Sequence, residues 1–410
     1  MTPEFSQDNL SGRARLYLDF LCSVKPNRRT GSPGNREATA FFADVMQSLG
    51  LEVDDSPFEC LDYVCDRVAL TRGTEAFDIR ASPYSLGCDL VAELVAASTV
   101  EELADADCEA KLLLLRGPIA SEQLMPKNFV FYNPEHHREL IRLLEARRPA
   151  AIIAATGRKP EQAGALDPFP LIVDGDFDIP NAYCRDSVGE ALAALQGTSR
   201  RLEIDAQRIP AKANNIVARL NPEAPSKVIL TAHIDAYEDS PGASDNASGT
   251  VVLLLCAHVL SDAPGSIGVE IVALNGEDHY SAAGQMDYLQ RYGARLAETA
   301  LAINIDDVGY IEGGTSYSFY ECPPDLVEAA GTALSEFDGL APGPPWFNGD
   351  HMIFVQRGVP AMAITAERTP ELMATITHTS DDTPEIIDTR KLVHLAEALS
   401  TWLRLFPGTA

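Results

Sequence analysis

The sequence predicts an α/β protein: a three-layer α/β/α core around a mainly parallel, mixed central sheet, plus a smaller inserted β-rich domain. Two observations lead to this fold class. After residue 201, short stretches rich in Val, Ile and Leu alternate with helix-like stretches, which is typical of strands and helices in an open sheet. Between residues 78 and 200 this regular alternation is absent, and Pro-containing loops separate short apolar strands. With 410 residues, the chain is long enough for two domains.

The first two segments are therefore 1–77, which opens the main domain, and 78–200, the insertion. The helix expected at 36–49 has apolar residues at helical spacing and ends before Gly50, a residue typical of helix C-caps. The elements expected here are helices 8–22 and 36–49, strands 51–53 and 64–70, strand 111–115, helix 135–146 and strand 150–155.

The third segment, 201–410, completes the main domain. Its alternation of strands and helices implies a mainly parallel sheet covered by helices on both faces. The expected strands are 215–220, 227–232, 269–274, 300–305 and 361–365, and the expected helices are 248–260, 282–292, 325–337 and 389–405.

Composition excludes several classes of partner. The net charge of −28 argues against nucleic acid and anionic membranes, because both would repel the chain. The N-terminus has no apolar core of signal-peptide length, and no stretch reaches the ~20 apolar residues of a membrane span. We therefore expect a cytoplasmic protein without a membrane partner, whereas the oligomeric state is left open. None of the eight cysteines forms a CxxC pair, so a thiolate metal site is not expected.

Polar residues of metal-ligand type follow three of the expected strands. The strand at 227–232 runs into His233, the strand at 269–274 is followed by Asn-Gly-Glu-Asp, and the strand at 300–305 runs into Asp306. In an open α/β sheet, ligands bind just beyond the carboxyl ends of the strands. Imidazole together with carboxylates is a ligand set typical of zinc.

Two further polar groups follow the strand that ends at His233. Asp235 is placed to orient the imidazole ring of His233 or to lie close to a metal, although a polar loop after a strand explains the pair as well. The segment 240–249, SPGASDNASG, precedes an apolar helix. Asp245 in this segment is either a helix cap or a carboxylate that bridges two metals.

The other candidates come in adjacent pairs or stand alone in a loop. Two adjacent carboxylates at a buried strand end repel each other unless a cation compensates them, so we expect Asp278 as a metal ligand and Glu277 as a general base. Asp306 is preferred over Asp307 as a ligand. His378, in the segment 377–383, is the expected last ligand.

The charges of these candidates fit two divalent ions. Two Zn²⁺ ions are balanced by Asp245, Asp278, Asp306 and one hydroxide, whereas the same carboxylates would be costly to bury alone. We expect two Zn²⁺, with Co²⁺ or Mn²⁺ as possible substitutes. Asp350 and His351 lie in a Gly-rich segment and are candidates for lining a substrate pocket. The remaining histidines are expected to be surface or core residues: 136, 137, 258, 279 and 394.

The motifs and their order resemble the co-catalytic di-zinc aminopeptidase family, which includes bacterial leucyl aminopeptidases and glutamate carboxypeptidase II. The insertion at about 78–200 resembles a protease-associated domain. The motifs that carry the resemblance are HID (233–235), SPGASDNASG (240–249), NGEDHYSAAG (275–284), NIDDVGY (304–310), GDHMIFVQRGVPA (349–361), HTSDDT (378–383) and the N-terminal segment 29–53.

The resemblance implies a ligand set. One zinc would be held by His233, Asp245 and Asp306, and the other by Asp245, Asp278 and His378, so Asp245 would be the bridge. It also implies Glu277 as the base and a cis peptide bond between Asp245 and Asn246. Many members have Glu in place of Asp278, and this departure puts the metal affinity of that ligand in question.

The function expected from the resemblance is a zinc-dependent exopeptidase that uses a hydroxide held between two metals, with aminopeptidase activity favoured. Its substrate would be a peptide or a small amide. The alternatives are a carboxypeptidase or another amidohydrolase on the same site, and a non-catalytic binding protein on the same fold. A single-zinc glutaminyl cyclase is disfavoured because both His233 and Asp306 are present.

Overall fold

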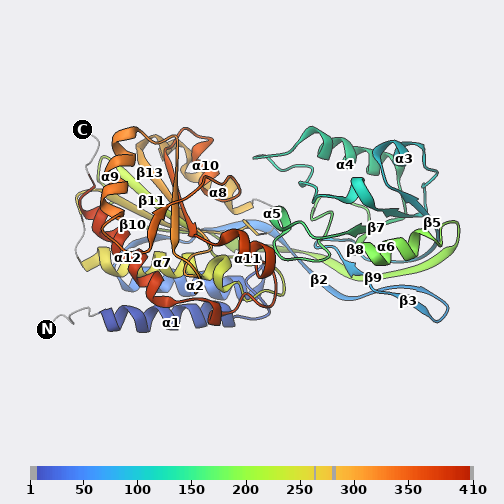
Figure 1. Ribbon diagram of the computed structural model, residues 1–410, viewed down its shortest axis with the longest axis horizontal. Helices are drawn as coiled ribbons and strands as arrows, with labels where there is room; N and C mark the ends of the chain where they lie inside the picture. The colour runs from blue at the N-terminus through green and yellow to red at the C-terminus, as the bar shows by residue number, and fades with distance from the viewer. Residues whose placement is uncertain (1–6, 263–264, 279–282, 407–410) are drawn as a thin grey trace.

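A computed structural model describes residues 7–262, 265–278 and 283–406 of the chain. It has two lobes joined by two long antiparallel strands, β2 (Pro57–Arg72) and β9 (Ser199–Asn214) (Figure 1). The first and the last described segments of the chain belong to one lobe, and the middle of the chain forms the other. Each lobe is built on an eight-stranded sheet.

The sheet of the first lobe is mixed, with a parallel centre. β11, β12, β13 and β16 run parallel to one another, and β10 and β14 pair antiparallel on either side of them. This arrangement confirms the fold class expected from the sequence. In spatial order the strands are β1 (Glu52–Asp54), β10 (Ile216–Leu220), β12 (Gly268–Leu274), β11 (Lys227–His233), β13 (Thr299–Ile305), β16 (Ala361–Ala366), β14 (Thr315–Tyr320) and β15 (Leu340–Pro342).

Helices cover both faces of this sheet because its strands are buried on both sides. Along β11, Val228 and Leu230 pack into one hydrophobic cluster and Ile229 packs into the other, as the two-residue period of a strand requires. The first cluster includes α1 (Gln7–Ser23), α2 (Pro33–Ser48), α7 (Gly249–Asp262), α9 (Pro324–Leu334) and α12 (Thr389–Arg404); the second includes α8 (Ala283–Tyr292) and α10 (His351–Val355).

The second lobe also has a sheet with helices on both faces. Leu113 and Leu115 pack with α4 (Glu135–Arg147), whereas Leu112 and Leu114 pack with α6 (Asp186–Ala193). Its strands are, in spatial order, β3 (Glu75–Phe77), β2, β9, β5 (Cys88–Ala97), β6 (Leu112–Leu115), β7 (Ala151–Thr156), β8 (Asn181–Arg185) and β4 (Arg80–Ala81). Its helices are α3 (Val100–Asp105), α4 (Glu135–Arg147), α5 (Pro160–Ala163) and α6 (Asp186–Ala193).

The long strands show where the two parts of the chain meet. β2 and β9 pair along most of their length and extend outside the expected insertion, 78–200, on both sides. The change in sequence composition identifies the middle of the second lobe. It does not identify the lobe's boundaries, because β2 and β9 run continuously from one lobe into the other. The domain boundaries expected from the sequence therefore stay a prediction.

One helical segment among the described residues is long and apolar enough to cross a membrane, Ala243–Asp262. It comprises η2 (Ala243–Ser248) and α7, and 94% of its apolar window is buried inside the fold. Such burial is what a core helix between a sheet and other helices requires.

A buried histidine links α7 to α1 and makes stability depend on pH. The Nε2 of His258 lies 2.8 Å from the hydroxyl of Tyr17. Burial and, to a smaller extent, the neighbouring Arg13 guanidinium lower the pKa of His258 to about 4. In the folded state His258 thus remains neutral at pH values at which the same side chain in the unfolded chain, with an ordinary pKa of ~6.5, is protonated. The stabilisation is complete above that value and is lost as the pH falls toward 4.

We expect the free energy of unfolding to fall by up to about 3 kcal/mol between pH 7 and pH 4 because of His258 alone. His258→Gln keeps a hydrogen-bonding side chain but cannot take up the proton. Urea unfolding at several pH values should therefore give a smaller loss of stability for this variant than for the wild type. Equal losses in the two proteins would contradict the assignment.

Candidate metal centre

The carboxyl ends of the central parallel strands bring the predicted ligands together. His233 is the last residue of β11 and pairs with Leu274, the last residue of β12. Asp306 directly follows β13, and its amide N–H donates to the carbonyl of Ile364 in β16 at 2.9 Å. Adjacent parallel strands that end at one edge of the sheet thus place side chains from distant parts of the sequence in one spot.

The first group consists of His233, Asp245 and Asp306, all buried. The Nε2 atom of His233 lies 3.0 Å from Oδ1 of Asp245 and 3.3 Å from Oδ1 of Asp306. One ligand atom from each residue lies within 4.8 Å of the others. Asp306 thus belongs to this candidate group, whereas the neighbouring Asp307 lies outside it: Oδ1 of Asp307 accepts a hydrogen bond from Ser244 Oγ at 2.8 Å.

The second group consists of Asp245, Asp278 and His378. The Nε2 atom of His378 lies 3.0 Å from Oδ1 of Asp278 and 3.2 Å from Oδ2 of Asp245. Asp245 thus belongs to both groups and turns one carboxylate oxygen toward each histidine. This is the arrangement that a bridging carboxylate needs, and the two groups have the membership that the resemblance implies.

Hydrogen bonding defines which nitrogen of His378 is available. Nδ1 lies 3.3 Å from the carbonyl oxygen of Ala163, and because a carbonyl only accepts, Nδ1 carries the hydrogen. The neutral ring then turns the lone pair of Nε2 toward two carboxylates. The ring of Tyr237 stacks on His378, with 4.6 Å between ring centroids and 19° between planes.

These atoms fit a divalent metal. Buried atoms without a hydrogen-bond partner include Nε2 of His233, Oδ2 of Asp278 and Oδ1 of Asp306. Burying such atoms without a partner is costly, and carboxylates that face the lone pairs of imidazoles need a cation between them. In the chain alone a proton takes that place: burial opposes the charged form of His378, but Asp278 and Asp245 outweigh it and raise the pKa of His378 well above its usual value.

The turn that carries Asp245 is held by backbone and side-chain bonds. The Asp245–Asn246 peptide bond is cis, as expected from the resemblance. Asn246 donates to the carbonyl of Ile305 at 2.9 Å, which ties the turn to β13. The carboxylate of Asp382 accepts from the amide N–H groups of Ser244, at 2.7 Å, and Asp245, at 3.1 Å. Sequence reasoning missed this role of Asp382, although its proximity to His378 in the chain was a signal.

Asp235 lies behind the first histidine. Its Oδ1 is 3.7 Å from Nδ1 of His233, too far for a hydrogen bond, and it accepts the amide N–H of Gly276 at 2.9 Å. Asp235 therefore holds the backbone next to Glu277. Burial raises the pKa of Glu277 well above its usual value, and the nearby carboxylates of Asp278, Asp306 and Asp350 raise it further. The roles of Glu277 and Asp235 in catalysis stay predictions.

An arginine that the sequence did not single out fixes the loop after His233. The guanidinium of Arg28 donates to four backbone carbonyls, those of Leu21, Ile234, Pro241 and Gly242, at 2.7–3.0 Å. The five N–H donors of a guanidinium allow one arginine to serve four carbonyls at once. A basic residue in an N-terminal loop gives no sequence signal for such a role.

The segment proposed to line a substrate pocket contributes a buried carboxylate. Asp350 is 2% exposed, its Oδ1 accepts a hydrogen bond from Gln285 at 3.0 Å, and its Oδ2 has no hydrogen-bond partner. Burial raises the pKa of Asp350 to about 7, and neighbouring Asp306 and Asp235 also raise it. His351 is buried beside Trp346, with 4.6 Å between ring centroids.

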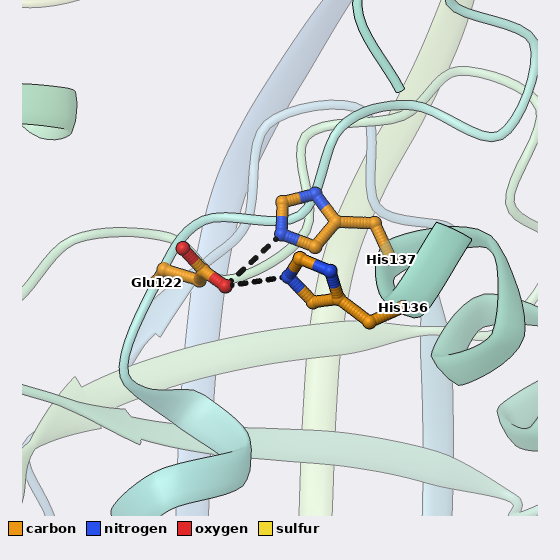
Figure 2. A group of neighbouring side chains, drawn as sticks. All are labelled: Glu122, His136 and His137. Atoms are coloured by element: carbon orange, nitrogen blue, oxygen red, sulfur yellow. Dashed lines mark hydrogen bonds and ion pairs between the residues drawn. The ribbon is translucent and has the colours of Figure 1, made fainter. Parts of the chain in front are cut away.

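A third group lies in the second lobe, where Glu122 meets His136 and His137 at the start of α4 (Figure 2). Both Nε2 atoms approach Oε1 of Glu122, at 2.8 Å for His136 and 3.3 Å for His137. The amide N–H of Met125 donates to Nδ1 of His137, so the neutral ring carries its hydrogen on Nε2 and has no lone pair there for a metal. We assign these contacts to holding α4 against the preceding loop.

Comparisons with known proteins agree with this architecture. Residues 215–403 match the family model described as Peptidase family M28. This part of the chain belongs to peptidase family M28. It contains both metal-ligand groups in full. Residues 279–282, which complete one of the motifs and include His279, lie outside the described residues.

Two curated relatives are aminopeptidases by name. The chain is 23% identical to the probable lipoprotein aminopeptidase LpqL of Mycobacterium tuberculosis over 73% of its own length and 59% of the relative's. It is 30% identical to aminopeptidase YwaD of Bacillus subtilis over 34% of its own length. The matched regions span about three fifths of LpqL and 31% of YwaD.

Solved structures share the fold of the whole chain. The aminopeptidase from Aneurinibacillus sp. strain AM-1 has a TM-score of 0.76 at 22% identity, and covers 96% of this chain and 93% of its own. BSAP, a zinc aminopeptidase from Bacillus subtilis, has a TM-score of 0.74 at 21% identity, with coverage of 96% and 94%. The likeness therefore extends over both lobes of the chain.

Proposed function

We propose that this M28 protein is a zinc-dependent exopeptidase that removes N-terminal residues from peptides. The observation that carries the proposal is the pair of three-ligand groups that share Asp245 at the carboxyl edge of the sheet. The names of LpqL, YwaD and BSAP support the same class of activity. Because all five ligands and Glu277 are present, a non-catalytic binding protein is the weaker alternative.

Zinc in these groups would polarise the carbonyl of the scissile amide and lower the pKa of an attacking water. His233, Asp245 and Asp306 would hold one ion, and Asp245, Asp278 and His378 the other. Glu277 directly precedes Asp278 and belongs to neither ligand group. Glu277 would therefore be available to take the proton of the attacking water and pass it to the leaving amine. Asp235 would keep Glu277 in place through Gly276.

The charges near the site favour a free amino group over a free carboxylate as the recognised end of the substrate. Asp350 is buried close enough to Asp306 and Asp235 for their charges to raise its pKa. The two arginines beside the loop after His233 are already engaged: Arg28 with backbone carbonyls, and Arg29 with Asp62 and Glu238. A terminal carboxylate would need a cation of this kind, whereas an ammonium group suits buried carboxylates.

The number of metal ions, two, and the cytoplasmic location stay predictions. The relative LpqL is a lipoprotein by name.

A panel of substrates tests the proposed function. Leucyl-p-nitroanilide and short peptides with a free N-terminus should be hydrolysed by zinc-loaded protein, with release of the N-terminal amino acid. The same peptides with an acetylated N-terminus should be resistant, and a chelator should abolish activity. Preferential cleavage of the acetylated peptides from their carboxyl ends would instead establish a carboxypeptidase.

A further inference from the structure

A short segment of the second lobe contacts the loop that carries His378. The segment, residues 158–165, includes α5, and the loop follows α11 (Thr369–Thr375). The amide N–H of Ala165 donates to the carbonyl of Thr377 at 2.9 Å. The guanidinium of Arg158 donates to the carbonyl of Ala374. Two regions more than two hundred residues apart in the sequence are thus joined by one backbone–backbone and one side chain–backbone hydrogen bond next to a predicted metal ligand.

Segment 158–165 is in turn fixed to its own lobe. Gln162 and Gln123 exchange hydrogen bonds, in which the backbone N–H of Gln123 donates to Oε1 of Gln162 at 2.8 Å and Nε2 of Gln162 donates to the carbonyl of Gln123 at 2.9 Å. The contact with the His378 loop is therefore made by a supported element.

Gly164 allows the close approach. Its φ of +60° and ψ of −149° lie in a region that is nearly restricted to glycine. A Cβ at this position would lie 2.7 Å from the carbonyl oxygen of Thr377 and 3.1 Å from Nδ1 of His378. The first distance is far below van der Waals contact and involves backbone, so one of the two segments would have to move. A side chain at this position therefore changes the contact between Ala163 and the imidazole, whichever segment moves.

We propose that segment 158–165 of the second lobe positions His378 for the metal, through the carbonyl of Ala163 and the close packing of Gly164. This inference rests on the proposed metal site. The carbonyl keeps the hydrogen on Nδ1 and leaves Nε2 free toward Asp245 and Asp278. Tyr237 holds one face of the ring, but stacking does not select which nitrogen carries the hydrogen. The second lobe thereby contributes to the metal affinity of the first.

The test is the metal affinity of Gly164→Ala in the full chain. Removing a group that orients a metal ligand typically lowers the affinity for the metal by about 10–100-fold. We expect the affinity for one of the two zinc ions to fall by this factor, and His378→Ala should lower the affinity for the same ion. Competition with a zinc chelator measures both affinities. The absorption bands of bound Co²⁺ should change for the same ion. The other ion should keep an affinity within about threefold of wild type.

Gly197→Ala is the matched control. Gly197 lies in the same lobe with a positive φ of +80°, but no atom lies within 4 Å of the position of an added Cβ. This variant has the conformational cost of a side chain at positive φ without a clash at the His378 loop. It should bind both zinc ions as the wild type does, although it is less stable to urea.

A second variant covers the case in which Gly164→Ala does not fold. Arg158→Ala removes only the exposed hydrogen bond to the carbonyl of Ala374. It should lower the affinity for the same zinc ion by about threefold, which corresponds to the stabilisation by one such hydrogen bond. If the wild type binds two zinc ions and every folded variant binds them with unchanged affinity, this inference is wrong and the proposed function still stands. A wild type that binds no zinc would overturn the proposed function itself.

Discussion

Glu277→Gln is expected to reduce kcat by about 10²–10⁴-fold while the protein keeps its zinc. Glutamine has nearly the same shape as glutamate but cannot accept the proton of the attacking water. Glu277 belongs to neither of the two ligand groups, so its substitution should leave metal binding intact. Steady-state kinetics on an aminoacyl amide, together with the zinc content of the same preparation, measures both properties.

Glu238→Gln provides a comparison for this loss. Glu238 pairs with Arg29 and with the hydroxyl of Tyr63, and belongs to neither ligand group. Its substitution removes one carboxylate charge from the same lobe. If both variants lost kcat to the same extent, the loss would come from the change in net charge and not from the removal of a base. A Glu277→Gln enzyme with wild-type kcat would eliminate Glu277 as the base.

Asp245→Asn is expected to lower the affinity for both zinc ions, by more than about 100-fold for each. An amide offers one oxygen acceptor where the carboxylate offers two, and it carries no charge to balance the cations. Because each oxygen of Asp245 faces a different histidine, a single substitution removes a ligand from both groups. His378→Ala should by contrast weaken one ion, and titration with a chelator distinguishes the two patterns.

Asp307→Asn serves as the neighbouring control. Asp307 is adjacent to Asp306 in the chain but directs its carboxylate to Ser244, outside both groups. It should retain both zinc ions. If Asp307→Asn lost zinc and Asp306→Asn kept it, the ligand assignment at the end of β13 would be wrong.

The fold of the main lobe could be predicted because its strands are buried on both faces. Such strands are continuous runs of Val, Ile and Leu, and the observed bounds of β11, β12 and β13 lie within one residue of the expected ones. Edge and connecting strands gave a weaker signal. β2 and β9 mix exposed with buried residues and cross from one lobe to the other, so only residues 64–70 of β2 and no part of β9 were expected.

The candidate site was predictable where its residues end strands or form motifs with a known order. His233 and Asp306 end or follow buried strands, and the choice of Asp306 over Asp307 followed from alternation along the strand. The residues that support them were not predictable. Arg28, Asp382 and Ala163 act through contacts across the fold, and a backbone carbonyl such as that of Ala163 leaves no trace in the residue type.

The most direct test of the two-metal account is the zinc content of the purified chain after equilibrium dialysis against buffered zinc, with Asp245→Asn dialysed in parallel. The account predicts two zinc ions for each wild-type chain and a loss of both in the variant. A wild-type chain that binds no zinc at saturation, or a variant that keeps the full wild-type content, would contradict it.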